Sequence, residues 1–348
     1  MAGGGGTRFW PLSRQATPKQ LLNLTGKELM INETIDRLQP IIRRADTYIV
    51  TSAQQATQMQ SATSGRIGCD HILLEPATCN TAACIGYAAV TIAKLHGDGI
   101  MCIFPADHHI ADEVSFRDTV SIAIDHTQVT DHLVTIGIKP SFPCTGYGYI
   151  RFDKTISNAV KPVIEFKEKP DYQTALTYLS SGEYVWNSGI FIWRASAILA
   201  AFKRLLPDIY TDLMVIQNAI ATADEERVLN TVYPNIRKIS IDFGVMEKSD
   251  QVVCIPSEFG WDDIGSWDMM NILHKKDQEG NIILGDASCI NTTNAVIYSS
   301  GRHISVIDMD DVVVVETADS VLVCKQSKAQ NVKLAVEKLK AIGRVDLL

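Results

Sequence analysis

The chain has 348 residues, of which 21% are charged and 46% are hydrophobic, and this composition argues against a disordered protein. Its net charge of −8 argues against general nucleic-acid binding, which needs a basic surface. No apolar run reaches the roughly 18 residues needed to cross a bilayer, and the first residues lack the apolar core of a signal peptide. We therefore expect a cytoplasmic protein of about two domains, with neither a nucleic-acid nor a membrane partner.

Four consecutive glycines, Gly3 to Gly6, open the chain and are followed at once by cationic residues. Glycine adopts positive φ without penalty and has no side chain to hold a ligand away, so several backbone N–H groups can point at one anion. Arg8, Arg14 and Lys19 lie within reach of the same charge. A flexible linker is also glycine-rich, but the segment that follows is neither polar nor repetitive. The spacing fits neither the P-loop nor the dinucleotide fingerprint, so we expect a phosphate-directed loop of another class.

Helical and strand-like patterns alternate along the next hundred residues. The periodicity predicts helices over 29–38, 53–64 and 80–96, and strands over 47–51, 71–74 and 100–104. This alternation indicates βαβ units and a parallel sheet that is covered on both faces. Ligands of such sheets collect at the carboxyl ends of the strands, which directs attention to the first loop, Glu75 and Asp107.

The pattern becomes less regular after a helix predicted over 116–126. We expect strands over 134–138, 147–152, 162–166, 185–193 and 252–255, with helical sequence over 195–232 and 266–274. The shorter connections indicate a mixed part of the sheet. The polar segment 275–280 is a plausible boundary, so we divide the chain into domains of residues 1–275 and 276–348. Five short strands between 282 and 324, without helices between them, predict that the second domain is all-β and closes with a helix over 329–339.

Two acidic positions in distant segments could bind a divalent cation. Asp107 directly follows a predicted buried strand, and Asp262 with Asp263 forms a second acidic pair. Magnesium prefers hard oxygen ligands and usually takes one or two carboxylates together with substrate phosphates. Both segments also precede helical stretches, so helix N-caps are the alternative. The residues alone leave the two interpretations open.

Further polar residues could bind a phosphorylated ligand. Lys169, fixed by the proline after it, could hold a phosphate as a point charge, although a solvated charged turn is the alternative. Asn187 offers both donors and acceptors, as a pair of sugar hydroxyls requires, and Glu75 and Asn80 could serve a nucleobase in the same way. The adjacent histidines at 108 and 109 would point to opposite sides of a strand end, so we favour a structural role for them.

Seven motifs occur in one order along essentially the whole chain. They are Gly-Gly-Gly-Gly-Thr-Arg-Phe-Trp-Pro-Leu-Ser-Arg from residue 3, Pro-Lys-Gln from 18, Phe-Pro-Ala-Asp-His from 104, Glu-Lys-Pro from 168, Trp-Asn-Ser-Gly-Ile-Phe from 186, Ser-Ile-Asp-Phe-Gly-Val-Met-Glu-Lys from 240, and Gly-Trp-Asp-Asp-Ile-Gly-Ser-Trp from 260. In these motifs the chain resembles the mannose-1-phosphate guanylyltransferases, a family of sugar-phosphate nucleotidyltransferases.

The resemblance implies a Rossmann-like α/β nucleotidyltransferase domain with a mixed, mainly parallel sheet, followed by a small C-terminal left-handed β-helix domain. It also implies a single-activity form without a phosphomannose isomerase domain, and a possible homodimer. The implied reaction joins GTP and mannose 1-phosphate to give GDP-mannose and pyrophosphate, with Mg²⁺ as cofactor. The sugar phosphate already carries a negative oxygen, so positioning and charge neutralisation would do most of the catalysis. A transferase for another base or sugar, and a weakly active regulatory relative, are the alternatives.

The resemblance also assigns roles residue by residue. The triphosphate would be held by the loop residues and two cations, Gly3, Gly4, Gly5, Gly6, Thr7, Arg8 and Lys19. Mg²⁺ would be bound by Asp107 and Asp263, the latter because the family's aspartate directly precedes a branched residue and a glycine. Mannose 1-phosphate would be held by Lys169 at its phosphate and by Gly146, Glu168, Asn187 and Asp242 at the sugar. Guanine would face residues 75–81, including Glu75, Asn80 and Thr81. Among these residues, the catalytic ones would be Arg8, Lys19, Asp107 and Lys169.

Three departures from the family pattern modify these expectations. Cys79 and Ala83 stand where the family commonly has arginine and proline, which weakens the expectation of guanine recognition. Phe243 and Gly244 replace a Tyr-Ala pair and remove a hydroxyl. The glycine loop normally follows an apolar strand, whereas Met1 stands two residues before the loop. We therefore expect that the natural chain starts a few residues earlier or that this variant is less active than its motifs suggest.

Overall fold

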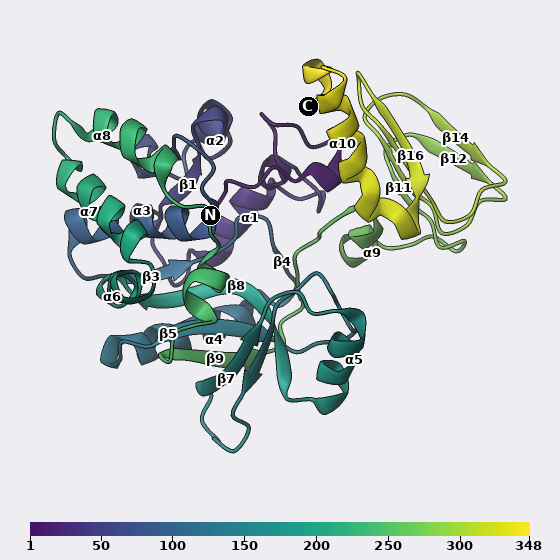
Figure 1. Cartoon of the computed structure of the whole chain (residues 1–348). Helices are drawn as coiled ribbons and strands as arrows, with labels where there is room; N and C mark the ends of the chain where they lie inside the picture. Colours follow the sequence, from purple (N-terminus) through teal and green to yellow (C-terminus); the bar gives the residue numbers. More distant parts are fainter.

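The computed structural model describes residues 1–348 and shows an α/β domain beside a smaller β domain (Figure 1). The larger domain is built on a six-stranded sheet in the order β3-β8-β5-β9-β7-β6. Its strands are β3 (Ile100–Ile103), β5 (Leu133–Ile138), β6 (Tyr149–Phe152), β7 (Lys161–Lys167), β8 (Tyr184–Arg194) and β9 (Val252–Ser257). Two further strands, β1 (Ile49–Ser52) and β2 (Ile72–Glu75), form a separate parallel pair.

The sheet is mixed, as predicted. β8 runs antiparallel to both β3 and β5, so β3 and β5 share one direction, and β9 lies parallel to β5. The strands β3, β5 and β9 all run in the same direction, in agreement with the predicted mainly parallel sheet. Among hydrogen-bonded neighbours, however, only β5 and β9 are parallel. The reason is that β8 inserts between two strands of the opposite direction, while β6 and β7 follow each other without a helix and so pair antiparallel.

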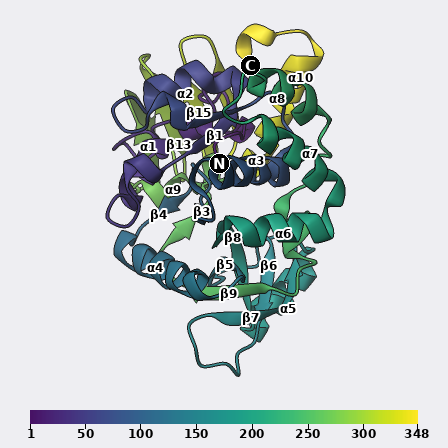
Figure 2. The same ribbon diagram turned by 90° about the vertical axis from the view of Figure 1, so that its left-hand side faces the viewer.

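Helices cover both faces of the sheet, because successive side chains of each strand point to opposite sides. On β9, Val252 and Cys254 pack against one group of helices, whereas Val253 and Ile255 pack against another. The first group is α3 (Asn80–His96), α6 (Ala195–Leu205), α7 (Pro207–Ala219) and α8 (Glu225–Val232). The second group is α4 (Glu113–Val129) and α5 (Tyr172–Ser181), joined by the last residue of α1 (Met30–Leu38), whose Ile31 and Ile35 pack with β1 and β2. Figure 2 shows α4 and α6 on opposite sides of the strands, as expected for a three-layer α/β domain.

Most predicted elements occur, and the exceptions have local causes. The helical sequence predicted over 195–232 is divided into three helices, the first break falling at Leu206 before Pro207. Helix α5 was not predicted; Asp171 caps it by accepting from the Thr174 N–H at 2.9 Å. The helix predicted over 266–274 is a short turn followed by α9 (Met270–Leu273). Two short strands, β4 (His109–Ile110) and β10 (Trp261–Asp262), pair antiparallel, and α2 (Ala56–Ala62) lies beside β1.

The second domain is a stack of short parallel strands. One parallel set contains β11 (Ile282–Leu284), β13 (Val296–Ser299) and β15 (Val312–Glu316), and the other contains β12 (Ala287–Ile290) and β14 (Ile304–Ile307). This stacking confirms the predicted β-helix; its left-handed sense stays a prediction. The stack ends in β16 (Val321–Lys325), which is antiparallel to β15, and in helix α10 (Val332–Ala341). None of the helices is long and apolar enough to traverse a bilayer.

The first two residues occupy part of a slot between β1 and β3. The Met1 amino group donates to the Phe104 carbonyl at 2.8 Å and the Met1 carbonyl accepts from Ala106 at 3.0 Å, which is the pattern of a parallel pair. Ala2 donates to the Val50 carbonyl of β1 at 2.8 Å. Beyond these residues the facing edges of β1 and β3 have no strand partner, and they border a mainly apolar cavity of about 610 Å³.

Candidate active site

A second cavity, of about 720 Å³, opens where several strands end, and it gathers most of the predicted site residues. Glu75 ends β2 at one side of it, and Pro105 follows β3. Predicted site residues that line it are Gly3, Gly4, Glu75, Asn80, Thr81, Gly146, Glu168, Asn187, Asp242 and Asp263. The predicted residues Gly5, Gly6, Thr7, Arg8, Lys19, Asp107 and Lys169 do not line the cavity itself. The prediction of a ligand site at the strand ends is thus supported by a volume typical of small-molecule pockets.

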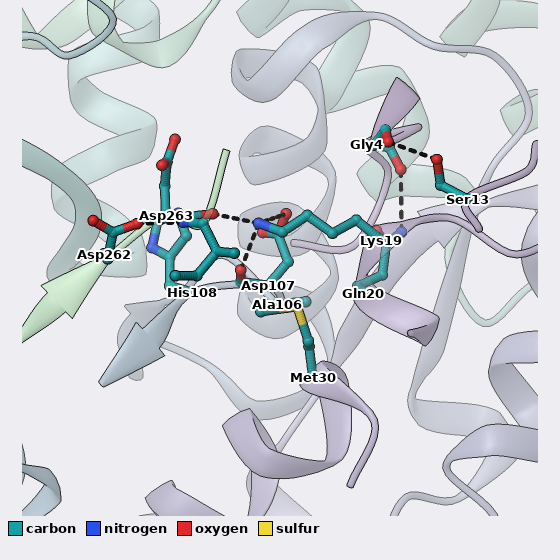
Figure 3. A network of polar contacts seen from close by, with 12 residues as sticks. Gly4, Ser13, Lys19, Gln20, Met30, Ala106, Asp107, His108, Asp262 and Asp263 are labelled. Atoms are coloured by element: carbon teal, nitrogen blue, oxygen red, sulfur yellow. Dashed lines mark hydrogen bonds and ion pairs between the residues drawn. The ribbon is translucent and has the colours of Figure 1, made fainter. Parts of the chain in front are cut away.

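The glycine loop presents unpaired donors. None of the N–H groups of Gly3 through Gly6 donates a hydrogen bond within the protein. The carbonyl groups of Gly4 and Gly6, in contrast, accept hydrogen bonds from side chains (Figure 3). Gln20 donates to the Gly4 carbonyl at 3.3 Å, and Ser13 donates to the Gly6 carbonyl at 2.7 Å. Gly6 has φ of 57°, and a Cβ there would approach the Lys19 Cβ to 2.5 Å, so this position requires glycine. The backbone N–H groups of these four glycines are therefore free to donate to a ligand.

Lys19 connects the two acidic segments. Its buried ammonium donates to the Asp107 carbonyl at 2.8 Å, to Asp107 Oδ2 at 3.1 Å and to the Asp263 carbonyl (Figure 3). These bonds use all three N–H donors of the ammonium. Direct contact between Lys19 and the phosphates stays a prediction. Lys19 holds two segments, distant in sequence, beside the glycine loop.

The structure distinguishes between the two adjacent aspartates. Asp262 is buried, and its Oδ1 accepts from the Ile264 N–H at 2.6 Å, so it stabilises its own turn. Burial raises the pKa of Asp262 to about 6. Asp263 faces the cavity, and its Oδ1 accepts from the Tyr147 hydroxyl at 2.8 Å. The preference for Asp263 over Asp262 as the cavity-facing carboxylate agrees with this geometry.

Neither acidic segment serves as a helix cap, which was the alternative interpretation. Asp112, not Asp107, caps α4 by accepting from the N–H groups of Val114 and Ser115. Ser266 is the N-cap residue of the short turn after Asp263. Burial would raise the pKa of Asp107, but Lys19 and other nearby positive groups outweigh it, and the pKa is lowered. Asp107 is therefore held as a carboxylate.

Asp107 and Asp263 fit a magnesium ion by their donor chemistry. Asp107 Oδ1 and Asp263 Oδ2 accept no hydrogen bond from the protein, so each carboxylate keeps an oxygen available. Lys19 holds the backbones of both residues. No cluster of three or more His, Cys, Asp or Glu residues is present, so the protein would supply few ligands, and substrate phosphates would supply others.

Arg8 supplies an uncompensated positive charge beside the turn that contains Asp263 and Gly265. It is exposed and forms no ion pair, in contrast to most arginines of the chain. A Cβ at Gly265 would lie 3.3 Å from Asp263 Oδ1 and 3.8 Å from an Arg8 terminal nitrogen. The Arg8 guanidinium and the Asp263 carboxylate thus lie on either side of the space above Gly265, where an anionic ligand could contact the guanidinium.

Three polar side chains form a hydrogen-bonded cluster at another wall of the cavity. The Asn187 amide donates to Asp242 Oδ1 at 2.9 Å and to Glu168 Oε1 at 3.3 Å. A Cβ at Gly148 would lie 2.3 Å from Glu168 Oε1, so a side chain there would displace the Glu168 carboxylate. Burial, together with Asp242, raises the pKa of Glu168 to about 7, and burial also raises the pKa of Asp242. The cluster offers closely spaced acceptors and donors of the kind that sugar hydroxyls require.

Three non-glycine residues of the candidate site have left-handed backbone. Asn80, Lys169 and Ile264 have φ of 69°, 49° and 43°. Such conformations cost on the order of 1–3 kcal/mol and cluster at functional sites. Ile264 is the clearest case, because β-branched residues strongly avoid this region. Lys169 is exposed and forms no ion pair, so its ammonium is available to a ligand.

The predicted base-binding segment has one pocket-facing carboxylate. Glu75 is buried and lines the cavity, and its Oε1 accepts from the Tyr233 hydroxyl at 2.5 Å. The Thr81 hydroxyl accepts from the Ile241 N–H at 2.9 Å and so ties this segment to the loop before Asp242. Cys79 and Ala83 are both fully buried and do not line the cavity. The two positions that depart from the family pattern therefore do not change the side chains that form the cavity wall.

Sequence reasoning missed several residues of the cavity. Tyr147, which orients Asp263, lies between Gly146 and Gly148, and an aromatic residue flanked by two glycines before a strand was a usable signal. Lys238 lines the cavity as a cation in an irregular segment, and no local pattern marked it. His108 also lines the cavity, but its Nδ1 accepts from the Trp261 indole at 3.0 Å and burial lowers its pKa to about 4, in agreement with a structural role.

Comparison with known proteins extends these observations over the whole chain. The Nucleotidyl transferase family matches residues 1–280, and the MannoseP isomerase/GMP-like beta-helix domain matches residues 285–339. The chain is 38% identical to mannose-1-phosphate guanylyltransferase ManC of Salmonella typhimurium, an alignment that covers 99% of this chain and 73% of that protein. A mannose-1-phosphate guanylyltransferase of Escherichia coli K12 is 37% identical with the same coverage. A solved structure from Thermus thermophilus, described as a mannose-1-phosphate geranyltransferase, is similar with 31% identity and a TM-score of 0.88 over 98% of both chains.

Proposed function

Because the chain belongs to the nucleotidyl transferase family, and within it to the mannose-1-phosphate guanylyltransferases, we propose that it transfers GMP from GTP to mannose 1-phosphate. The observation that carries the proposal is a single cavity of about 720 Å³ that joins the glycine loop to the cluster of Glu168, Asn187 and Asp242. The two substrates need an anion-binding loop and a sugar-binding wall that open into one space, and this cavity provides both.

The reaction needs no side chain to act as a nucleophile or base. An anionic phosphate oxygen of mannose 1-phosphate attacks the α-phosphorus of GTP, and the bond from that phosphorus to the bridging oxygen breaks. GDP-mannose and pyrophosphate are the products, so atoms and charge balance. What remains for the protein is to align two anions and offset their charge.

The residues of the site divide this work. The free N–H groups of the glycine loop and the Arg8 guanidinium would bind the triphosphate. Lys169, exposed and unpaired, would bind the phosphate of mannose 1-phosphate. Asn187 and its two carboxylate partners would orient the sugar hydroxyls.

Asp107 and Asp263 would hold Mg²⁺, which would neutralise phosphate charge when bound. Lys19 would keep the two aspartates in register through its three hydrogen bonds. Tyr147 would fix the Asp263 carboxylate by donating to one of its oxygens, leaving the other free. In this proposal Lys19 acts on the carboxylates rather than on the phosphates.

The activity is tested by incubating the protein with GTP, mannose 1-phosphate and MgCl₂. GDP-mannose and pyrophosphate should form in equal amounts, as measured by ion-exchange chromatography and a coupled pyrophosphatase assay. A panel of nucleoside triphosphates and hexose 1-phosphates tests selectivity. Turnover of dTTP with glucose 1-phosphate, without turnover of GTP with mannose 1-phosphate, would contradict the proposal, as would binding of GDP-mannose without any turnover.

The metal assignment has its own test. Asp107→Asn should lower kcat by roughly 10²-fold or more at saturating Mg²⁺, because charge stabilisation at the reacting phosphate is lost. Asp118→Asn, an exposed aspartate on α4, is the matched control and should leave kcat unchanged. Wild-type turnover by the Asp107 variant would show that this carboxylate holds no catalytic metal.

A further inference from the structure

Tyr233 is a buried tyrosine outside the cavity whose hydroxyl reaches a cavity residue. Its side chain is fully buried, and its hydroxyl donates to Glu75 Oε1 at 2.5 Å. Its ring packs edge-on against Tyr87, with centroids 5.8 Å apart, and its backbone carbonyl accepts from the Cys79 thiol. The hydroxyl therefore has one partner, and that partner is the carboxylate at the predicted base end of the cavity.

We propose that Tyr233 is a positioning residue for guanine selectivity, which it confers by fixing the Glu75 carboxylate toward the base. This inference rests on the proposed use of GTP. Guanine presents two adjacent donors on its Watson–Crick edge, N1–H and the 2-amino group, and a carboxylate can accept from both. Adenine presents an acceptor at N1, and hypoxanthine lacks the 2-amino group. A carboxylate in a fixed orientation thus discriminates guanine from both bases, since the site's buried polar group would otherwise stay unpaired.

The electrostatic surroundings of Glu75 give Tyr233 a second effect. Burial raises the pKa of Glu75, whereas the Tyr233 hydroxyl and the Met1 amino group act to lower it. The other titratable groups close enough to interact with Glu75 are the neutral thiols and phenol of Cys79, Cys84 and Tyr87, whose pKa values burial raises. The tyrosine hydroxyl therefore favours the ionised form of Glu75, and only that form can accept two hydrogen bonds from guanine.

The test compares Tyr233→Phe with Tyr87→Phe in the full chain. Tyr87 is also buried and packs against Tyr233, but its hydroxyl forms no bond to Glu75, so it controls for loss of a buried hydroxyl. In Tyr233→Phe, KM for GTP should rise by roughly tenfold, with kcat little changed, because no reacting atom is touched. KM for ITP should rise less, so the preference for GTP over ITP should shrink. Tyr87→Phe should keep the wild-type preference.

The pH profile provides a readout that a merely structural role would not move. Removing the hydroxyl raises the pKa of Glu75, so the acidic limb of kcat/KM for GTP should shift to higher pH in Tyr233→Phe. Glu75→Gln should abolish the shift, and adding Tyr233→Phe to it should cost little more, because the two residues act as one unit. Equal losses with GTP and ITP, or an unshifted acidic limb, would overturn the positioning role. Wild-type protein that makes no GDP-mannose would instead overturn the proposed function.

Discussion

The slot between β1 and β3 makes a strong prediction about stability. Both strands present unpaired edges to a cavity of about 610 Å³, and its lining is mainly aliphatic, with Ile35, Ile85, Ile92 and Met101 among the contributors. A five-residue extension Val-Ile-Val-Ile-Val joined to Met1 would enter this slot as a parallel strand. β1 and β3 are each four residues long, so a five-residue extension is long enough to pair with either strand along its whole length.

The magnitude follows from burial on both faces of the sheet. Each added side chain would contribute about 1.5–3 kcal/mol by leaving water, and ordering its backbone would cost about 1–2 kcal/mol. The net gain should be about 3–5 kcal/mol over five residues, before any contribution from the new hydrogen bonds. For a domain of this size, that corresponds to an increase in Tm of about 10 °C.

Thermal unfolding followed by circular dichroism measures the gain, and a Ser-Lys-Ser-Lys-Ser extension serves as the matched control because it cannot be buried. Hydrogen exchange gives the location: amides of β1 and β3 that face the slot should become protected only with the apolar extension. Equal Tm values for the two extensions, or protection elsewhere in the chain, would refute the view of this cavity as a strand site.

Three further predictions concern the loop and the acidic clusters. Gly6→Ala should destabilise the fold by about 1–3 kcal/mol in denaturant unfolding, whereas Gly5→Ala, whose Cβ would meet only a Thr7 methyl group at 3.9 Å, should not. Lys19→Met should cost about 3–5 kcal/mol in the same assay, because it leaves Asp107 partly buried without its partner; a loss below about 1 kcal/mol would contradict the proposed tie. The pKa of Glu168 is raised to about 7 in the folded state, so the folded protein binds a proton that the unfolded chain releases, and stability should fall as pH rises from about 4.5 to 7. Glu168→Gln should flatten that slope, and an identical slope in the variant would disprove the raised pKa.

Local patterns in the sequence were sufficient for much of the fold. The periodicity over 80–96 gave helix α3 with its observed bounds, and the short apolar runs gave β1, β2 and β3 to within two residues. These elements follow from short-range spacing and flanking turn residues. The direction of β8 could not be predicted from such local patterns, because it depends on which strands β8 pairs with and not on the alternation of its own side chains. The pairing partners of a strand are a property of the whole sheet.

The candidate site shows the same division. Gly3, Gly4, Asn187 and Asp263 line one cavity, and the sequence could single them out because each belongs to a motif that is contiguous in sequence. The role of Lys19 could not, since its partners lie 88 and 244 residues away. The Tyr233 hydroxyl likewise reaches Glu75 across 158 residues. Residues that act by positioning others are identified only once tertiary contacts are known.

The β-helix domain also contacts the segment that directly follows the glycine loop. Directly after the loop, Phe9 packs against Trp267 with ring centroids 5.2 Å apart, and the Trp10 indole donates to the Leu347 carbonyl at 2.8 Å. Arg14 forms an ion pair with Asp319 at 2.6 Å. The apolar cluster that contains Phe9 and Trp10 also includes Val296 and Val313 of the β-helix and residues of α10. The flank of the loop away from the cavity is therefore fixed by the second domain, while Gln20 and Ser13 hold its carbonyls. Because these contacts hold the segment that directly follows the glycines, the second domain supports the position of the loop without lining the cavity.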